Sequence, residues 1–356
     1  MSIIWALLLL AILVIVHEFG HFFAARLMKI EVREFAVGFG PKLLGWKSRK
    51  YETRFAVRAI PLGGYCAFYG EDDVSGESRD DPRAFPKQNV WKRLLVILMG
   101  PMMNFLLAFV VAAVFFWCSG VTVATGVDPY IAEVMAAGPA YSAGLQSGDR
   151  ITEINGVNML DGTVDTLTTT LASWKEGDAP LNMTVRRGEE TLRMSMTPVW
   201  DEAEKKMRIG VIIGGVYRTE NRPVTIWGGI SESATMCWDA AGAILRALKN
   251  LVTTGEGLDQ TSGPVGIVSL VSSEVASGGF SAFVQLLVLI SINLGLMNLL
   301  PIPGLDGSRL VFGLIEVIRG KPVSPRREAL VHTVGMVFLF GIMIFFTYKD
   351  ILKLFR

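Results

Sequence analysis

Four long apolar segments separated by polar stretches dominate the pattern of this 356-residue chain. They cover about residues 3–27, 94–117, 280–300 and 330–348, and each contains few charged side chains. A helix needs about 20 predominantly apolar residues to cross the hydrocarbon core of a bilayer. The pattern therefore predicts a polytopic α-helical membrane protein with four transmembrane helices.

The first polar stretch, residues 31–70, contains short β-like runs bounded by glycine and proline. Such punctuation is typical of hairpins rather than helices. We expect a β-hairpin region associated with the membrane next to the first helix. The N-terminal membrane part then covers residues 1–118.

A second, larger polar block separates the middle two apolar segments. Its first part, residues 122–215, has short alternating runs and turn signals, which predict a small β-barrel domain. Residues 216–279 are expected to form a connector, helical over 226–252, and residues 280–356 form the C-terminal membrane part.

The β-domain also contains a recognisable order of residues. Gly-Leu-x-x-Gly-Asp-x-Ile over 144–151, followed by Asn-Gly at 155–156, resembles the PDZ domains of bacterial membrane and periplasmic proteases. A PDZ groove takes an extended peptide by adding it as a strand to a sheet edge. The alternative is a spacer domain that only covers the membrane part.

Composition narrows the function classes. Apolar residues make up 51% of the chain and charged residues 19%, so both membrane and aqueous parts are expected. The net charge of +1 gives no field that favours nucleic acid, and none is expected as a partner. Cys66, Cys118 and Cys237 lack Cys-x-x-Cys spacing, so neither a disulfide framework nor a thiolate metal site is predicted.

Basic residues predict the orientation. They concentrate in the loop after the first apolar segment and recur between the third and fourth, and such loops stay cytoplasmic. Both termini and the 122–215 domain are then extracytoplasmic, although three basic residues at the C-terminus weakly oppose this. The first segment lacks a basic start, so we expect it to be retained rather than cleaved as a signal.

The first apolar segment contains the motif His17-Glu18-Phe19-Gly20-His21. Positions i and i+4 share one face of a helix, so His17 and His21 can bind one metal ion with Glu18 beside it. Ionisable side chains at membrane depth are costly unless they are paired or bind a cation. The motif therefore predicts a zinc site that activates water where the bilayer provides almost none.

Catalytic zinc requires a third protein ligand. Asp306 is the better candidate, because Pro301 and Pro303 break the third apolar segment just before it, and a broken helix is tolerated where it lines a cavity. The alternative function of Asp306 is a helix N-cap. His332 is the other candidate ligand, although an interfacial or hydrogen-bonded histidine is its more ordinary role.

These motifs together resemble the site-2 protease family of intramembrane zinc metalloproteases, and most closely its regulator of sigma-E protease group. The features shared are His-Glu-x-x-His, Gly100-Pro101 with Asn104, a PDZ-like insert, and Asn-x-x-Pro-x-Pro-x-Leu-Asp-Gly over 298–307. The resemblance covers essentially the whole chain. One PDZ-like domain is recognisable where some members have two in tandem.

The resemblance implies a role for each matching residue. His17, His21 and Asp306 hold Zn²⁺, and Glu18 is the general base. Asn298 contacts the substrate backbone, with interhelical hydrogen bonding as its alternative role, whereas Asn104 and Asn293 are expected to pack between helices. The segment Gly38, Phe39 and Gly40 receives the substrate as an added strand.

The resemblance also implies the biological setting. The protein is a multi-pass protein of the bacterial cytoplasmic (inner) membrane, with its active site toward the cytoplasm. It cleaves the transmembrane helix of single-pass proteins, such as anti-sigma factors and remnant signal peptides, after a first extracytoplasmic cut. Extracytoplasmic peptide termini are expected at the PDZ-like domain.

Two other function classes remain open from the sequence. A catalytically silent membrane scaffold would bind peptides without zinc. A membrane-tethered zinc protease of soluble chains would place the motif outside the lipid and use a downstream glutamate, for which Glu316 is the candidate.

Overall fold

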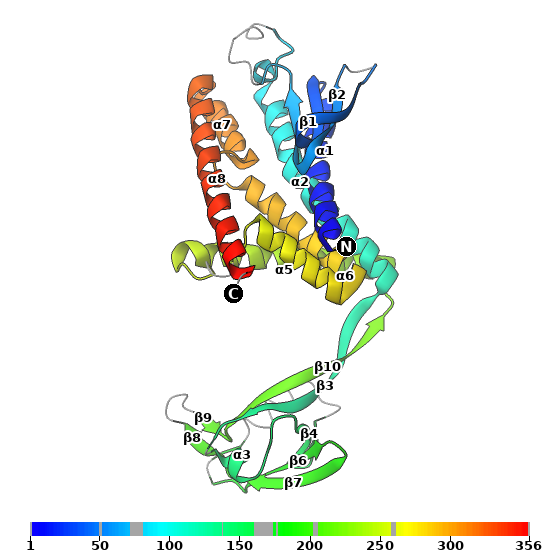
Figure 1. The fold of residues 1–356 in the computed structure, drawn as a ribbon, viewed down its shortest axis with the longest axis vertical. Helices are drawn as coiled ribbons and strands as arrows, with labels where there is room; N and C mark the ends of the chain where they lie inside the picture. Colours follow the sequence, from blue (N-terminus) through cyan, green and yellow to red (C-terminus); the bar gives the residue numbers. More distant parts are fainter. Residues whose placement is uncertain are drawn as a thin grey trace. The chain divides into compact units, whose positions relative to one another are not determined.

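The computed structural model describes residues 2–49, 52–71, 81–136, 138–159, 174–175, 177–201, 206–257 and 261–354. These residues divide into two compact units. Residues 1–118 together with 225–356 form the membrane unit, and residues 119–224 form the β unit. Figure 1 shows the elements of each unit.

The membrane unit contains four helices that are long and apolar enough to cross a bilayer. They are α1 (Ser2–Leu27), α2 (Val90–Ser119), α6 (Pro264–Leu299) and α8 (Pro325–Leu354). The shorter helix α7 (Asp306–Arg319) follows α6 and precedes α8 in the chain. This arrangement agrees with the four spans expected from hydropathy.

The largest difference from the expected boundaries is at the start of the third long helix. The third long helix begins at Pro264, before the expected residue 280, and its backbone is non-helical at Gly279. The apolar segment 280–300 therefore corresponds to its second half, because hydropathy responds to the lipid-compatible part of a helix and not to its start.

The amphipathic helix α5 (Ile226–Thr253) occupies the expected connector. Apolar residues of α1 near its N-terminal end, Ala6, Leu9 and Leu13, pack against Val271 and Leu287 of α6. This contact joins the first and third spans into one core.

A small sheet follows α1. It is built from β1 (Val32–Lys47) and β2 (Arg54–Phe68), two long bulged strands that pair along three stretches, one of which is residues 42–47 with 54–58. Residues 54–57 of β2 pair with 34–37 of β1, and residues 64–68 of β2 pair with the same part of β1 from its other side. Residues 64–68 thus form an edge of this sheet. The whole sheet lies within residues 31–70, the β-hairpin region expected from the sequence.

The α1 and α2 helices approach closely because small residues lie at their contact. A Cβ atom at Gly20 would collide with the Met99 carbonyl oxygen, and one at Gly100 would collide with the His21 ring. Small residues at such contacts allow membrane helices to pack backbone to backbone.

The β unit contains a six-stranded sheet in the order β10-β3-β4-β6-β7, with β5 paired to β4. The long strands β3 (Val121–Val134) and β10 (Val211–Arg222) pair along their length. The remaining strands are β4 (Arg150–Ile154), β5 (Val157–Asn158), β6 (Leu181–Arg187) and β7 (Glu190–Met196), with a separate pair β8 (Val199–Asp201) and β9 (Lys206–Arg208).

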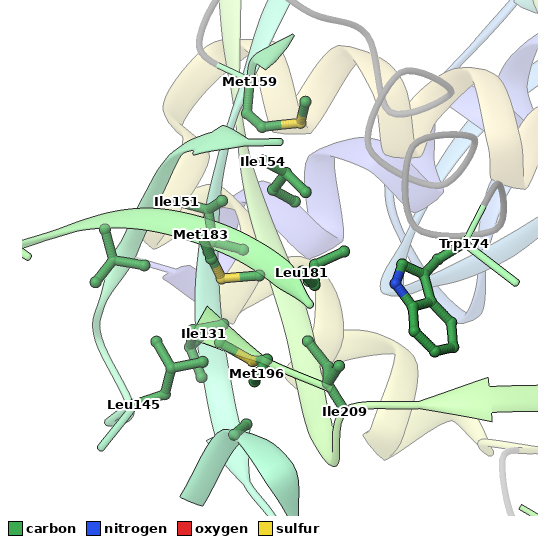
Figure 2. Packing of buried hydrophobic residues seen from close by; sticks show 12 residues of the cluster. Ile131, Leu145, Ile151, Ile154, Met159, Trp174, Leu181, Met183, Met196 and Ile209 are labelled. Atoms are coloured by element: carbon green, nitrogen blue, oxygen red, sulfur yellow. The ribbon is translucent and has the colours of Figure 1, made fainter. Parts of the chain in front are cut away.

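The core of the β unit is apolar and close-packed (Figure 2). Ile131, Ile151, Ile154 and Val185 are fully buried there, and the short helix α3 (Pro139–Ser142) covers it with Ala140. Strand β10 continues to Arg222, so the connector begins later than the expected residue 216. Parts of the expected 122–215 domain, residues 160–173 and 202–205, lie outside the described residues.

One buried ion pair stabilises the β unit. Asp149, whose side chain is 1% exposed, accepts hydrogen bonds from Arg187 Nε at 2.7 Å and Nη2 at 2.8 Å, and from the Gln146 N–H at 2.9 Å. Burial alone would raise the pKa of Asp149, but the Arg187 and Gln146 hydrogen bonds lower it below its ordinary value.

We expect Asp149→Asn to lower the unfolding free energy of the β unit by about 2 kcal/mol, because hydrogen bonds to charged groups contribute roughly 1.5–3 kcal/mol each. Since the folded pKa is depressed, the wild type has this stabilisation above the unfolded pKa of about 3.9 and loses it as the pH falls through the folded value. Amide hydrogen exchange of β4 and β6 in the full chain measures both effects. The control is Asp128→Asn, which removes the more exposed pair with Arg150 and should cost at most about 1 kcal/mol.

Gly20→Ala should destabilise the membrane unit by about 1–3 kcal/mol, because the added methyl group pushes α1 away from α2. Thermal unfolding in detergent measures the change. Gly341→Ala is the matched control, because a Cβ at Gly341 on α8 meets nothing within 4 Å. Equal melting temperatures for the two variants would show that the α1–α2 contact is not tight.

Candidate metal centre

Helix α1 places two histidines on one buried face. His17 and His21 are 8% and 7% exposed, and their Nε2 atoms lie 3.3 Å apart. The four-residue spacing produces this arrangement, because one turn of helix brings the second ring above the first.

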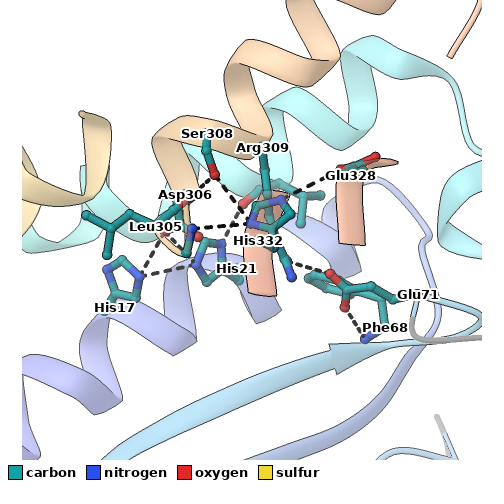
Figure 3. Close-up of polar contacts among 12 residues, drawn as sticks. His17, His21, Phe68, Glu71, Leu305, Asp306, Ser308, Arg309, Glu328 and His332 are labelled. Atoms are coloured by element: carbon teal, nitrogen blue, oxygen red, sulfur yellow. Dashed lines mark hydrogen bonds and ion pairs between the residues drawn. The ribbon is translucent and has the colours of Figure 1, made fainter. Parts of the chain in front are cut away.

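Asp306 reaches the same point from the other end of the chain (Figure 3). Its Oδ2 atom lies 3.1 Å from His17 Nε2 and 3.3 Å from His21 Nε2. Helix α6 ends at Leu299, the chain turns through Pro301 and Pro303, and α7 begins at Asp306. Among the described residues, these three form the one group whose ligand atoms converge as a metal site requires.

The spacing of the three atoms fits a tetrahedral zinc ion. Zinc bonds of about 2.0–2.1 Å in tetrahedral geometry separate neighbouring ligand atoms by about 3.3 Å. The Asp306 Oδ2 atom is buried and receives no hydrogen bond from the described residues. Two imidazole nitrogens and one carboxylate oxygen also match the donor set of catalytic zinc, which keeps one position open.

Both histidines have a second polar partner. His21 Nδ1 lies 2.9 Å from the Val96 carbonyl oxygen, to which it donates, so Nε2 is left with a free lone pair. His17 Nδ1 lies 3.1 Å from the Asn104 side-chain amide. The Asn104 atom at this distance is Nδ2. Nε2 coordination leaves Nδ1 of His17 protonated, so the amide must be turned by about 180° to present its oxygen as the acceptor.

Asn104 therefore does more than the interhelical packing expected from the sequence. It is fully buried on α2, and its backbone carbonyl accepts a hydrogen bond of 2.8 Å from Ser291 of α6. Asn104 thus connects His17 to both neighbouring spans. The Gly100-Pro101 motif with Asn104 marked this residue only as a feature shared with the family, and the structure alone brings Asn104 to His17.

Glu18 is half-buried and lies against the edge segment of β2. A Cβ at Gly64 would be 3.4 Å from Glu18 Cγ, and the backbone of Cys66 also faces the Glu18 carboxylate. The carboxylate therefore lies between the two histidines and a sheet edge.

The segment Gly38, Phe39 and Gly40 lies elsewhere in the sheet. Phe39 pairs with Ile60, and its ring stacks on Tyr65 with centroids 6.5 Å apart. A Cβ at Gly38 would collide with backbone oxygens of β2. The part of the sheet nearest Glu18 is the 64–68 edge, which sequence reasoning missed because the double pairing of β1 is not visible in the pattern.

The Tyr65 hydroxyl and Arg58 bind the same carboxylate. Glu34 Oε1 lies 2.7 Å from Arg58 Nη2 and 2.8 Å from the Tyr65 hydroxyl. Burial alone would raise the pKa of Glu34, but these hydrogen bonds lower it below its ordinary value. These hydrogen bonds connect residues 34–37 of β1, which pair on both sides, to residues 64–68 of β2 at the edge of the sheet.

Two of the remaining candidates have clear positions. Asn298 is half-buried in the last turn of α6, and its side chain makes no hydrogen bond within the described part of the chain. His332, the alternative third ligand, does not converge with His17 and His21. It contacts Gly304 and Ser308 instead.

Ion pairs hold α7 in place. Arg309 Nη1 lies 2.5 Å from Glu71 Oε1, and Glu316 Oε1 lies 2.5 Å from Arg93 Nη2 of α2. The other oxygen of Glu71 accepts the Phe68 N–H at 3.3 Å. Glu71 therefore links the end of β2 to the helix that carries Asp306 (Figure 3). Glu316 is engaged in this pairing and is not part of the metal group.

Comparison with known proteins identifies the family. The model of peptidase family M50 matches residues 5–342. A protein of Clostridium acetobutylicum named as a zinc metalloprotease is 34% identical, with 98% of this chain and 97% of the relative covered. A protein of Agrobacterium fabrum with the same activity in its name is 33% identical, with 98% and 95% covered.

The regulator of sigma-W protease RasP of Bacillus subtilis is 31% identical, with 99% of each chain covered. These relatives are similar to this chain along their whole length. The names of the first two include zinc, and the converging ligand atoms of His17, His21 and Asp306 are suited to a zinc ion. The chain therefore belongs to peptidase family M50, the site-2 protease family, and is a zinc metalloprotease of the membrane.

Proposed function

We propose that this protein is an intramembrane endopeptidase that hydrolyses peptide bonds within the transmembrane segment of single-pass membrane proteins. One observation carries the proposal: the ligand atoms of His17, His21 and Asp306 lie within 4.8 Å of one another, and the two histidines are on a helix long and apolar enough to cross a bilayer. A protease of soluble chains has no need for such a position.

His17, His21 and Asp306 are proposed to hold the zinc ion. When bound, zinc supplies a Lewis acid that acidifies water and polarises a carbonyl group. Glu18 is adjacent to His17 in sequence and lies beside the metal group, so its carboxylate is the general base that holds the proton taken from water. The Val96 carbonyl and the Asn104 amide keep the two imidazoles in the orientation and tautomer that ligation requires.

A transmembrane substrate has to be extended before it can be cut, because the carbonyls of a helix are hydrogen-bonded within the helix. The 64–68 edge of β2 lies next to Glu18, and no other described strand pairs with its outer side. We therefore place the substrate along this edge as an added strand. Gly38, Phe39 and Gly40 then act indirectly, because Phe39 packs on Tyr65 of the edge.

The biological setting is also proposed. The basic loops support an active site toward the cytoplasm and an extracytoplasmic β unit, in the bacterial inner membrane. The relative named as a regulator of sigma-W protease supports substrates of the anti-sigma-factor kind, cut after a first extracytoplasmic cleavage. The β unit, as a PDZ-like domain, would bind the new peptide terminus or exclude untrimmed proteins.

Glu18→Gln should retain zinc and reduce cleavage of a model transmembrane substrate by about 10²- to 10⁴-fold, because the general base is lost while the ligands remain. Asp306→Ala should weaken both zinc binding and cleavage, because one of the three ligands is lost. Metal content and single-turnover cleavage in detergent measure the two properties. Normal cleavage by Glu18→Gln would rule out the proposed mechanism.

Asn298→Ala should lower kcat/KM by about 10- to 100-fold, because a buried peptide group left without its hydrogen-bond partner costs about 1–3 kcal/mol. Zinc affinity should not change, because Asn298 is not a ligand. Asn293→Ala, on the exposed side of α6, is the matched control and should cleave normally. If both variants behave alike, Asn298 does not contact the substrate.

A further inference from the structure

The turn that carries Asp306 is a helix break inside the membrane unit, and its backbone donors can be accounted for one by one. Leu300 donates its N–H to Met297, Ile302 to Leu300 and Leu305 to Ile302. Pro301 and Pro303 have no N–H to satisfy. Gly304 is the one residue between Leu300 and Leu305 whose N–H depends on a side chain, and that side chain is His332 of α8.

The His332 contact is specific in its atoms (Figure 3). The Gly304 N–H donates to His332 Nδ1 at 3.3 Å, and Ser308 Oγ lies 3.5 Å from the same nitrogen. The Ser308 hydroxyl already donates to the Leu305 carbonyl at 2.8 Å. Nδ1 is therefore an acceptor, and the ring proton of a neutral His332 is on Nε2, which lies 4.0 Å from Glu328 Oε1.

The position of Asp306 depends on this turn. The Asp306 Oδ2 atom receives no hydrogen bond from the described residues that could orient it. Gly304 and Ser308 lie two residues before and after Asp306, so His332 contacts the chain on both sides of the ligand. An unpaired N–H in this low-water environment would favour another conformation of the turn.

We propose that His332 is a positioning residue of the metal centre: by accepting the Gly304 N–H and contacting Ser308, it holds the turn in the conformation that directs Asp306 at His17 and His21. The inference rests on the proposed ligand set. It gives α8, which contributes no ligand to the metal group, a defined role at the site.

The test compares three substitutions of His332, one of which should keep the hydrogen bond from the Gly304 N–H. Asn can place an amide oxygen where Nδ1 of histidine lies, whereas the amide of Gln extends to the position of Nε2. His332→Asn should therefore keep the Gly304 hydrogen bond, and His332→Ala and His332→Gln should lose it. Partners of this kind change metal affinity by about 10- to 100-fold when removed.

The measurement is zinc affinity of the full-length protein in detergent, by competition with a chelator, together with the visible absorption spectrum of the Co²⁺-substituted protein. His332→Ala and His332→Gln should bind zinc about 10- to 100-fold more weakly and change the Co²⁺ spectrum. His332→Asn should approach wild-type values in both. Thr333→Val is the matched control, because it removes a side-chain hydrogen bond from the next residue of α8 that does not reach the turn.

The outcomes separate this inference from the proposed function. If Asp306→Ala loses zinc affinity while His332→Ala and His332→Gln match the wild type in affinity and spectrum, the ligand set stands and the role of His332 is wrong. If His332→Asn is as weak as His332→Ala, the hydrogen bond is not the cause and the inference also fails. If Asp306→Ala itself keeps full affinity, the ligand set is wrong.

Discussion

The mutual approach of three buried acceptor atoms is the constraint on which the membrane unit depends. Two imidazole nitrogens and a carboxylate oxygen lie 3.1–3.3 Å apart, inside a bundle where water is scarce. Such an arrangement is costly unless a cation fills it. The close α1–α2 contact, the break after α6 and the ion pairs of α7 all keep these atoms together.

Much of the membrane unit could be predicted from the sequence because its signals are local. Apolar runs predict the membrane spans, and the four-residue spacing of His17 and His21 predicts that they share one face of a helix. The pairing of Asp306 with that face is not local. The carboxylate that follows the proline break made Asp306 the better candidate for the third ligand, the resemblance to a known family implied the same, and the structure supplied the distances.

Other features could not be predicted because they depend on tertiary contacts. The β1 strand pairs on both sides, so the edge near Glu18 is formed by residues 64–68 and not by Gly38–Gly40. Asn104 was expected to be a packing residue, since nothing in its neighbours shows that it faces His17. The first half of α6 also escaped prediction, because the polar and small residues before Gly279 do not resemble a continuous apolar span.

The order of the ligands along the chain has a consequence for biosynthesis. His17 and His21 are in α1 and leave the ribosome long before Asp306, which follows α2, the β unit, α5 and α6 in the chain. On the proposed ligand set, a nascent protein that has inserted α1 but not yet α7 contains Glu18 without a complete metal site. Such a newly made protease would be unable to cut peptide bonds until α7 has docked against α1.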